Sequence, residues 1–382
     1  MQQMKCPISR QCNACQLQNM NYEEQLAFKQ RKARRHLEKF CEISPIMGMD
    51  FPYHYRNKAQ FTFRKIKGGA IIAGIYQSKT QGIASTETCM LNPPAADAIA
   101  KTLCKLLKSF KISIYDPRSQ AGYFRHVLIR SGQYSGEIMV VLVTTGTAFP
   151  KKTSFINALL REHPEISTVV LNVSHSDKMM LGEEEEVVFG KGYIEDTLCS
   201  KSFKISPRSF FQVNSIQTEK LYNAAIQGAA LTGEEMVIDA YCGTGTISII
   251  ASDFVKSAVG VELVDSAVRD AVYNAEKNKV ENCRFIRADA GSFMNGFSRE
   301  NKKADAVFLD PPRAGCSRKF LLSLIGLAPK KIIYISCNVQ TQERDLTFLT
   351  KRGYIATAIQ PVDMFPHTNH VETCVLLSHK NS

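Results

Sequence analysis

The 382-residue chain contains no tryptophan and no apolar run approaching about eighteen residues, so no membrane-spanning helix is expected. Its first residues, MQQMKCPISRQCNACQ, lack the apolar core segment of a secretory signal peptide. Internal repeats and low-complexity tracts are also missing. These absences predict a cytoplasmic protein with no membrane partner. In that compartment the twelve cysteines argue against a disulfide framework.

Acidic residues are comparatively scarce. The chain has 48 Lys and Arg against 36 Asp and Glu, a net charge of +12, and the first 100 residues alone hold fourteen basic against seven acidic residues. Such an excess favours a polyanionic partner, most simply nucleic acid, and no obligate protein partner is evident. The length and a hydrophobic content of 44% predict two or three domains with real cores.

Residues 1–50 are expected to form an N-terminal arm followed by a basic helix from Tyr22 to Phe40. The arm carries cysteines in the pattern C-x5-C-x2-C. One face of the helix could contact phosphates, or it could be an ordinary solvated surface. That face comprises Lys29, Arg31, Lys32, Arg34 and Arg35.

Residues 51–214 are expected to form a central α+β domain of antiparallel strands that binds RNA. Tyr53–Lys65 and Ala70–Gln77 flank Gly68-Gly69, a hairpin signal. Aromatic and basic residues alternate in the first strand and could stack on bases, or the strand could simply be half-buried. These residues are Tyr55, Arg56, Lys58, Phe61, Phe63 and Arg64.

Residues 215–382 change to a strict β-α alternation, which predicts a doubly wound, Rossmann-like α/β domain with a parallel sheet. The last two strands fit an antiparallel hairpin on the edge of that sheet. Strands are expected at 236–241, 258–263, 283–287, 305–309, 331–336, 354–360 and 371–378.

A glycine loop follows the first strand of this domain, in the stretch MVIDAYCGTGT at 236–246. Glycine permits close approach of the backbone to a ligand, but the loop is not the G-x-G-x-x-G of dinucleotide sites. The next strand ends in Glu262, where a carboxylate suits ribose hydroxyls. With Asp239 and Tyr241, the set resembles class I S-adenosylmethionine-dependent methyltransferases; a nucleotide-binding domain for another ligand is the alternative.

Two later strands end in reactive side chains. The stretch KKIIYISCN places Cys337 just beyond the carboxyl end of a buried strand, where a thiol is either a nucleophile or a small buried hydrophobe. The preceding strand ends in Asp310-Pro311-Pro312-Arg313. This stretch is similar to the motif of amino-group methyltransferases, in which an aromatic residue stands at the position of Arg313. Arg313 therefore argues against methylation of an amino group, and attention turns to Cys337.

The combination of DPPR, SCN, the segment FPHTNHVET and the segment SFFQVN resembles the RNA uracil-5-methyltransferases over nearly the whole chain. Within them it is most similar to the 23S rRNA enzymes that carry a [4Fe-4S] cluster and no TRAM domain. The resemblance implies S-adenosylmethionine contacts from Gln212, Tyr241, Glu262 and Asp310. It implies Cys337 as nucleophile, Glu372 as general base, and Cys6, Cys12, Cys15 and Cys89 as cluster ligands.

The implied reaction adds the thiolate of Cys337 to carbon 6 of uracil, methylates carbon 5, and uses Glu372 to remove the carbon 5 proton. The implied product is 5-methyluridine in 23S rRNA. Methylation of tRNA, and a non-catalytic RNA-binding protein with the same fold, are the alternatives. Zinc is the alternative to iron–sulfur for the four cysteines, because short C-x2-C spacing suits both.

Overall fold

The computed structural model describes residues 6–12, 14–77, 82–86, 88–176 and 179–381, and the chain divides into two compact units. Unit 1 comprises residues 1–18, 52–197 and 204–208. Unit 2 comprises residues 19–51, 198–203 and 209–382. The boundaries differ from a simple division at residues 50 and 214, because the segment 19–51 groups with the C-terminal part of the chain.

Unit 1 is built on one seven-stranded sheet in the order β3-β2-β1-β4-β5-β6-β7. Its strands are β1 (Lys58–Lys65), β2 (Ile71–Tyr76), β3 (Ile83–Ser85), β4 (Phe124–Ser131), β5 (Ile138–Thr144), β6 (Ile166–Val173) and β7 (Glu184–Phe189). Its helices are α1 (Ser9–Cys12), α3 (Pro94–Ser109) and α4 (Lys152–Glu162). A ribbon of β8 (Ile194–Leu198) and β9 (Lys201–Ile205) follows where the chain passes into unit 2.

The prediction of antiparallel strands in this domain was wrong for one pair of neighbours. β5 and β6 pair in parallel, whereas the other neighbouring strands of this sheet are antiparallel. The reason is α4, which lies between them in the sequence and returns the chain to the same end of the sheet before β6 begins. Parallel neighbours require such a crossover.

The aromatic residues of the first strand do not form an exposed stacking surface. Tyr55, Phe61 and Phe63 are buried, and the rings of Phe63 and Phe124 meet edge to face with centroids 5.0 Å apart. Phe61 and Phe63 belong to the core between the sheet and helices α3 and α4. The half-buried interpretation is therefore correct for these rings, and base stacking by them is excluded by burial.

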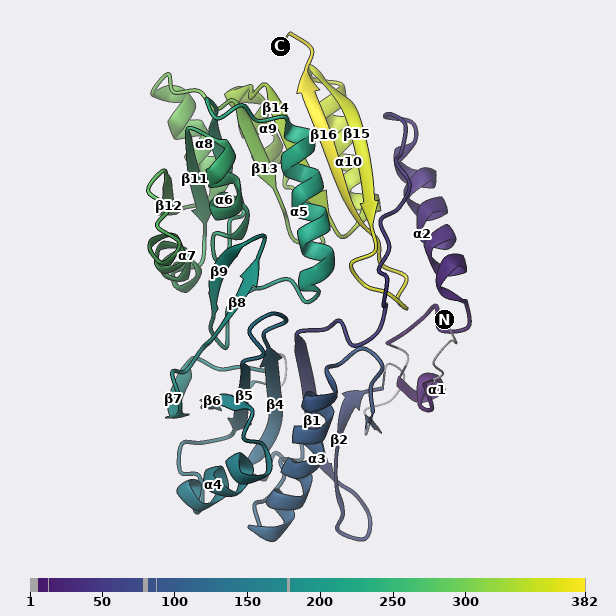
Figure 1. The fold of residues 1–382 in the computed structure, drawn as a ribbon, viewed down its shortest axis with the longest axis vertical. Coiled ribbons are helices and arrows are strands. Elements are labelled where there is room, and N and C mark those ends of the chain that lie inside the picture. The colour runs from purple at the N-terminus through teal and green to yellow at the C-terminus, as the bar shows by residue number, and fades with distance from the viewer. Residues whose placement is uncertain (1–5, 13, 78–81, 87, 177–178, 382) are drawn as a thin grey trace. The chain divides into compact units, whose positions relative to one another are not determined.

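Unit 2 contains the expected doubly wound sheet, in the order β12-β11-β10-β13-β14-β16-β15 (Figure 1). Its strands are β10 (Met236–Asp239), β11 (Ser257–Glu262), β12 (Cys283–Arg287), β13 (Ala306–Leu309), β14 (Lys331–Ser336), β15 (Tyr354–Val362) and β16 (Glu372–His379). Its helices are α2 (Tyr22–Leu37), α5 (Ser215–Ala229), α6 (Thr246–Ala251), the 3-10 turn η1 (Ser252–Phe254), α7 (Asp265–Lys277), α8 (Ala290–Arg299), α9 (Arg318–Leu327) and α10 (Val339–Thr350).

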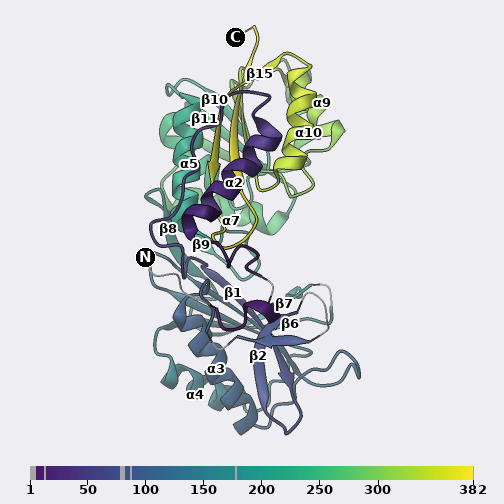
Figure 2. The ribbon, with the colours of Figure 1, turned by 90° about the vertical axis from the view of Figure 1, so that its right-hand side faces the viewer.

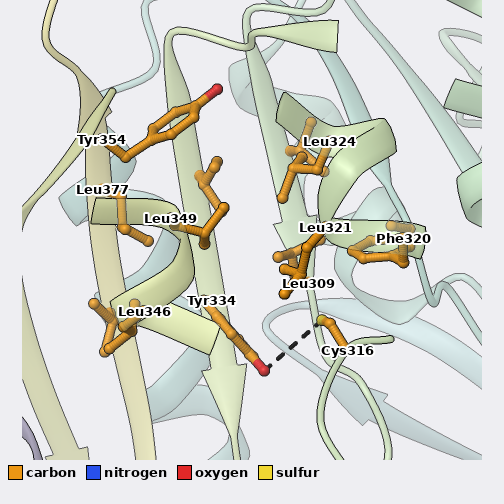
Figure 3. Close-up of a cluster of buried hydrophobic side chains, with 14 of the residues drawn as sticks. Leu309, Cys316, Phe320, Leu321, Leu324, Tyr334, Leu346, Leu349, Tyr354 and Leu377 are labelled. Atoms are coloured by element: carbon orange, nitrogen blue, oxygen red, sulfur yellow. Dashed lines mark hydrogen bonds between the residues drawn. The ribbon is translucent and has the colours of Figure 1, made fainter. Parts of the chain in front are cut away.

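Strands β10 to β14 run parallel, and β16 enters antiparallel to both β14 and β15. The central parallel strands β13 and β14 are short and mostly apolar, as both of their faces are covered. Figure 3 shows part of this core, where leucines of α9 and α10 meet side chains of β13 and β14. Within the described residues, no helix has the length and apolarity needed to span a bilayer.

Helix α2 packs against β15 and α10 of unit 2 (Figures 1 and 2). Asn21 begins it with a capping box, its side chain accepting from the backbone of Glu24. The predicted basic face does not exist as one surface. Arg31, Arg34 and Arg35 are exposed, but Lys29 is completely buried in an ion pair with Asp363, at 2.5 Å.

Candidate active site

A cavity of about 600 Å³ opens at the carboxyl ends of the parallel strands of unit 2. This is where doubly wound sheets place their ligands. It is lined by Phe210, Phe211, Gln212, Val213, Tyr222, Tyr241, Cys242, Gly243, Thr244, Thr246, Ile247, Glu262, Asp310, Pro311, Pro312, Arg313, Cys337, Phe365 and Glu372. All six residues expected from the sequence to bind cofactor or perform chemistry therefore meet in one cavity.

The glycine loop after β10 forms one wall of the cavity. Gly243 and Gly245 both have positive φ, and an added Cβ at Gly245 would meet the Phe285 ring at 2.9 Å. Beneath the loop, Asp239 is buried and accepts from the backbone N–H and hydroxyl of Ser248, at 3.1 and 2.8 Å. Burial raises the pKa of Asp239 to about 6. The buried carboxyl thus joins the loop to α6.

Glu262 stands at the end of β11 beside the same loop. Its Oε2 accepts from the Gly243 backbone at 3.2 Å, and its Oε1 accepts from Leu263 and Val264 at 2.8 and 2.9 Å. The carboxylate is thereby held at the cavity wall. A fixed acceptor at this place suits the ribose hydroxyls of a nucleoside cofactor.

Asp310 and Gln212 form a second polar group in the cavity. Gln212 Nε2 donates to Asp310 Oδ2 at 3.3 Å. Burial and the nearby charge of Asp239 raise the pKa of Asp310 to about 7, and the bond from Gln212 opposes the shift. Tyr241 packs its ring against Phe320 at 5.2 Å between centroids, which fixes the ring at the cavity edge.

The register of β14 against β16 brings Cys337 and Glu372 together. Ser336 pairs with Thr373, so the next residue of β14 and the preceding residue of β16 are Cys337 and Glu372. The two lie 35 positions apart in sequence but at the same edge of the sheet. A thiol and a carboxyl group therefore face the same cavity as the glycine loop.

Burial and the neighbouring carboxyl groups raise the pKa of both groups. Burial, with the charges of Glu372 and Asp310, raises the pKa of Cys337 to about 11, while Arg313 lowers it. Burial, and then Asp310, raises the pKa of Glu372 well above its usual range, and Arg313 again opposes the shift. Arg313 is thus the local cation that favours both anionic forms.

We expect the reactivity of Cys337 toward iodoacetamide to rise about ten-fold per pH unit between pH 7 and 9, because only the thiolate reacts and its pKa lies above this range. Arg313→Met should slow the reaction at each pH, since the cation that lowers the pKa is gone. Peptide mass spectrometry resolves Cys337 from the other cysteines. A rate that levels off near pH 8 in the wild type contradicts the prediction.

The four cysteines proposed as metal ligands all belong to unit 1. Burial raises the pKa of Cys15 to about 12. The charge of Arg56 lowers this pKa, whereas Cys89, Cys12 and Cys6 raise it. The four thiols therefore lie within electrostatic range of one another. Among the described residues, no group of three or more His, Cys, Asp or Glu is arranged to hold a metal ion. The structure gathers the thiols without forming a closed site.

Tyr222, Phe365 and Arg313 are among the cavity residues that were not singled out from the sequence as site residues. Tyr222 lies in the middle of α5, where no local motif marks a binding role, and Phe365 is the first residue of the segment FPHTNHVET between β15 and β16. Arg313 was noted only because it replaces an aromatic residue. Its effect on two neighbouring pKa values depends on the strand ends that surround it.

The family model described as tRNA (Uracil-5-)-methyltransferase matches residues 21–380, and the chain belongs to this family. Its members are S-adenosylmethionine-dependent RNA uracil-5-methyltransferases. The match extends from α2 to the end of β16, so it includes every residue that lines the cavity.

Individual proteins similar to this chain are also named as RNA methyltransferases. An uncharacterized RNA methyltransferase of Clostridium tetani is 41% identical over 98% of this chain and 82% of its own length. One of Halalkalibacterium halodurans is 40% identical over 98% and 83%. The crystal structure of Pyrococcus abyssi tRNA (uracil-54, C5)-methyltransferase in complex with S-adenosyl-L-homocysteine is similar with a TM-score of 0.79 and 29% identity, covering 96% of this chain and 86% of that chain.

Proposed function

We propose that the protein methylates carbon 5 of a specific uridine in 23S rRNA through a covalent bond between Cys337 and carbon 6 of uracil. The observation that carries the proposal is the convergence of Cys337 and Glu372 on the cavity that also contains the glycine loop and Glu262. Carbon 5 of uracil is a weak nucleophile. A thiolate added to carbon 6 moves electron density onto carbon 5, which can then attack an electrophilic methyl group.

Each step has a residue in the cavity to perform it. Arg313 favours the thiolate of Cys337, which forms the bond to carbon 6. S-adenosylmethionine supplies the methyl group, and its sulfur leaves with the electron pair of the broken bond. Glu372 takes the proton from carbon 5, and that electron pair expels the thiolate from carbon 6. Its raised pKa makes the carboxylate of Glu372 a stronger proton acceptor than that of an ordinary glutamate.

We infer that Gln212, Tyr241, Glu262 and Asp310 hold the cofactor. Glu262 offers a fixed carboxylate for the ribose, and Tyr241 presents a packed ring at the cavity edge. Asp310 and Gln212 are hydrogen-bonded neighbours in the lining of the same cavity. The target base must leave its stack to reach this cavity, so an unpaired or flipped uridine is the substrate form.

Transfer RNA is the second candidate substrate, favoured by the similarity to the Pyrococcus abyssi enzyme, which is a tRNA (uracil-54, C5)-methyltransferase. Nucleoside mass spectrometry of 23S rRNA and tRNA from a deletion strain separates the two. Loss of 5-methyluridine from 23S rRNA, restored by the wild-type gene but not by Cys337→Ala, supports the proposal. Loss from tRNA alone assigns the other substrate. An unchanged content in both RNAs favours a non-catalytic RNA-binding protein.

We further propose that Cys6, Cys12, Cys15 and Cys89 bind one [4Fe-4S] cluster with a structural role. The supporting observations are the four thiols within electrostatic range of one another and the charge of Arg56, which lowers the pKa of Cys12, Cys15 and Cys89. Cys89 is more than seventy positions from the other three, so a shared cluster would close a long loop of unit 1. Metal binding would then contribute to the folding free energy of this segment.

We expect Cys89→Ser to lose the brown colour and most of the bound iron of anaerobically purified protein. RNA binding should weaken more than S-adenosylmethionine binding, because the four cysteines belong to unit 1 and the proposed cofactor residues to unit 2. Cys104→Ser, in α3 of the same unit, is the control and should retain iron. Stoichiometric zinc without iron in the wild-type protein contradicts the cluster.

A further inference from the structure

A stripe of polar side chains on α2 contacts the loop of residues 363–371, which joins β15 to β16 and ends at Glu372. The stripe consists of Tyr22, Gln25, Lys29 and Lys32. The spacing of three, four and three residues places all four on one face of the helix. Together these side chains bond the loop at Asp363, Phe365, His367 and Asn369, so the helix contacts most of its length.

The central contact of the stripe is the buried ion pair. Lys29 Nζ donates to Asp363 Oδ1 at 2.5 Å and to the carbonyl oxygen of Phe365 at 2.9 Å. Tyr22 donates its hydroxyl to the other oxygen of Asp363 at 3.0 Å. Phe365 itself lines the cavity. The cation therefore holds both the start of the loop and the backbone of a cavity residue.

The next contact holds a strained residue. His367 is a buried non-glycine residue with φ of 69°, a conformation that persists only where surrounding contacts impose it. Gln25 supplies such contacts: its Oε1 accepts from the His367 backbone at 2.9 Å, and its Nε2 lies 3.2 Å from His367 Nδ1. Gln25 is fully buried, so its amide has no water to bond instead.

The far end of the loop and its opposite side are also held. Lys32 Nζ donates to the carbonyl oxygen of Asn369 at 2.8 Å. From the other side, Asn214 donates to the carbonyl oxygen of Met364 at 3.0 Å and Gln217 to that of Asp363 at 3.1 Å. The loop is fixed between α2 and the start of α5.

We propose that Gln25, Lys29 and Lys32 are positioning residues for the proton-abstraction step, because they fix the loop that leads into Glu372 and carries Phe365. The inference rests on the proposed role of Glu372 as general base. A displacement of about 1 Å in a catalytic group slows a reaction by up to about 100-fold. Loosening the loop should therefore slow proton removal more than thiol addition or methyl transfer, so that the covalent enzyme–RNA intermediate accumulates.

The test compares Gln25→Leu with Gln30→Leu. Gln30 lies on the same helix and also bonds the backbone twice, but at Ser44 and Ile46 rather than at the loop. We expect Gln25→Leu to reduce kcat by about 10- to 100-fold, to leave KM for S-adenosylmethionine unchanged, and to show a retarded band with labelled RNA on a denaturing gel. Gln30→Leu should show neither change.

Lys32→Met and Glu372→Gln complete the design. Lys32→Met removes one partly exposed contact to the loop, so this variant is expected to fold. It should accumulate less adduct than Gln25→Leu but more than the wild type. If Gln25→Leu does not fold, the amount of adduct with Lys32→Met decides the question. Glu372→Gln sets the reference amount of adduct. Adduct with Glu372→Gln but not with the stripe variants overturns only the positioning role. No adduct with Glu372→Gln overturns the general-base assignment and the inference with it.

Discussion

Replacing Cys337 with alanine is expected to lower formation of 5-methyluridine by about 10⁴-fold or more, the scale on which loss of a covalent nucleophile reduces turnover. Without the thiol, carbon 5 of uracil is not activated. The affinity for S-adenosylmethionine should stay within about two-fold of the wild type, because the proposed cofactor contacts come from Gln212, the β10 loop, β11 and the end of β13.

The measurement is methyl transfer from labelled S-adenosylmethionine into RNA, with cofactor affinity determined by calorimetry. Cys41→Ala is the matched control, since Cys41 packs against the core of unit 2 without lining the cavity, and it should retain activity. Turnover near the wild-type rate by the Cys337 variant would show that the thiol is not the nucleophile.

Glu372→Gln is expected to stop the reaction after methyl transfer, leaving methylated RNA covalently bound to Cys337. Glutamine keeps the shape of the buried side chain but cannot accept the carbon 5 proton, and loss of a general base costs about 10²- to 10⁴-fold. The adduct should appear as a slow band on a denaturing gel, with methyl label in it.

The double variant Cys337→Ala with Glu372→Gln serves as control and should give no band, because the bond to carbon 6 cannot form. Raising the pH should speed release of product from the wild-type enzyme, since the pKa of Glu372 is raised and more of the carboxylate forms as protons are lost. Rapid turnover by Glu372→Gln without an adduct excludes this carboxyl group as the base.

The architecture of unit 2 could be predicted from local sequence patterns. Parallel strands of four to six residues, the central ones mostly apolar, alternate with helices, and each strand end carries a polar or glycine-rich segment. Parallel strands place these ends at one edge, so Tyr241, Glu262, Asp310 and Cys337 could be expected to meet. Glu372 joined this set only through the family resemblance. The pairing of Ser336 with Thr373 gives the physical reason that it lies beside Cys337.

Unit 1 was harder to predict. The sequence of the first strand is compatible with an exposed aromatic surface and with a core strand. The structure selects the core, because α3 packs against β1 and Phe61 and Phe63 join the buried cluster of unit 1. The parallel pairing of β5 with β6 was missed although an eleven-residue helix separates the two strands, which is itself the pattern of a crossover connection.

The sequence by itself determined the class of fold in unit 2, the glycine loop and the motifs that place the protein in its family, since these depend on residues close together in the chain. Only the tertiary structure decided the role of α2. Lys29 belongs to a basic helix and is expected to be solvated, yet it lies buried against Asp363, 334 positions away. Contacts at such separations depend on which surfaces the folded chain brings together, and no local periodicity records them.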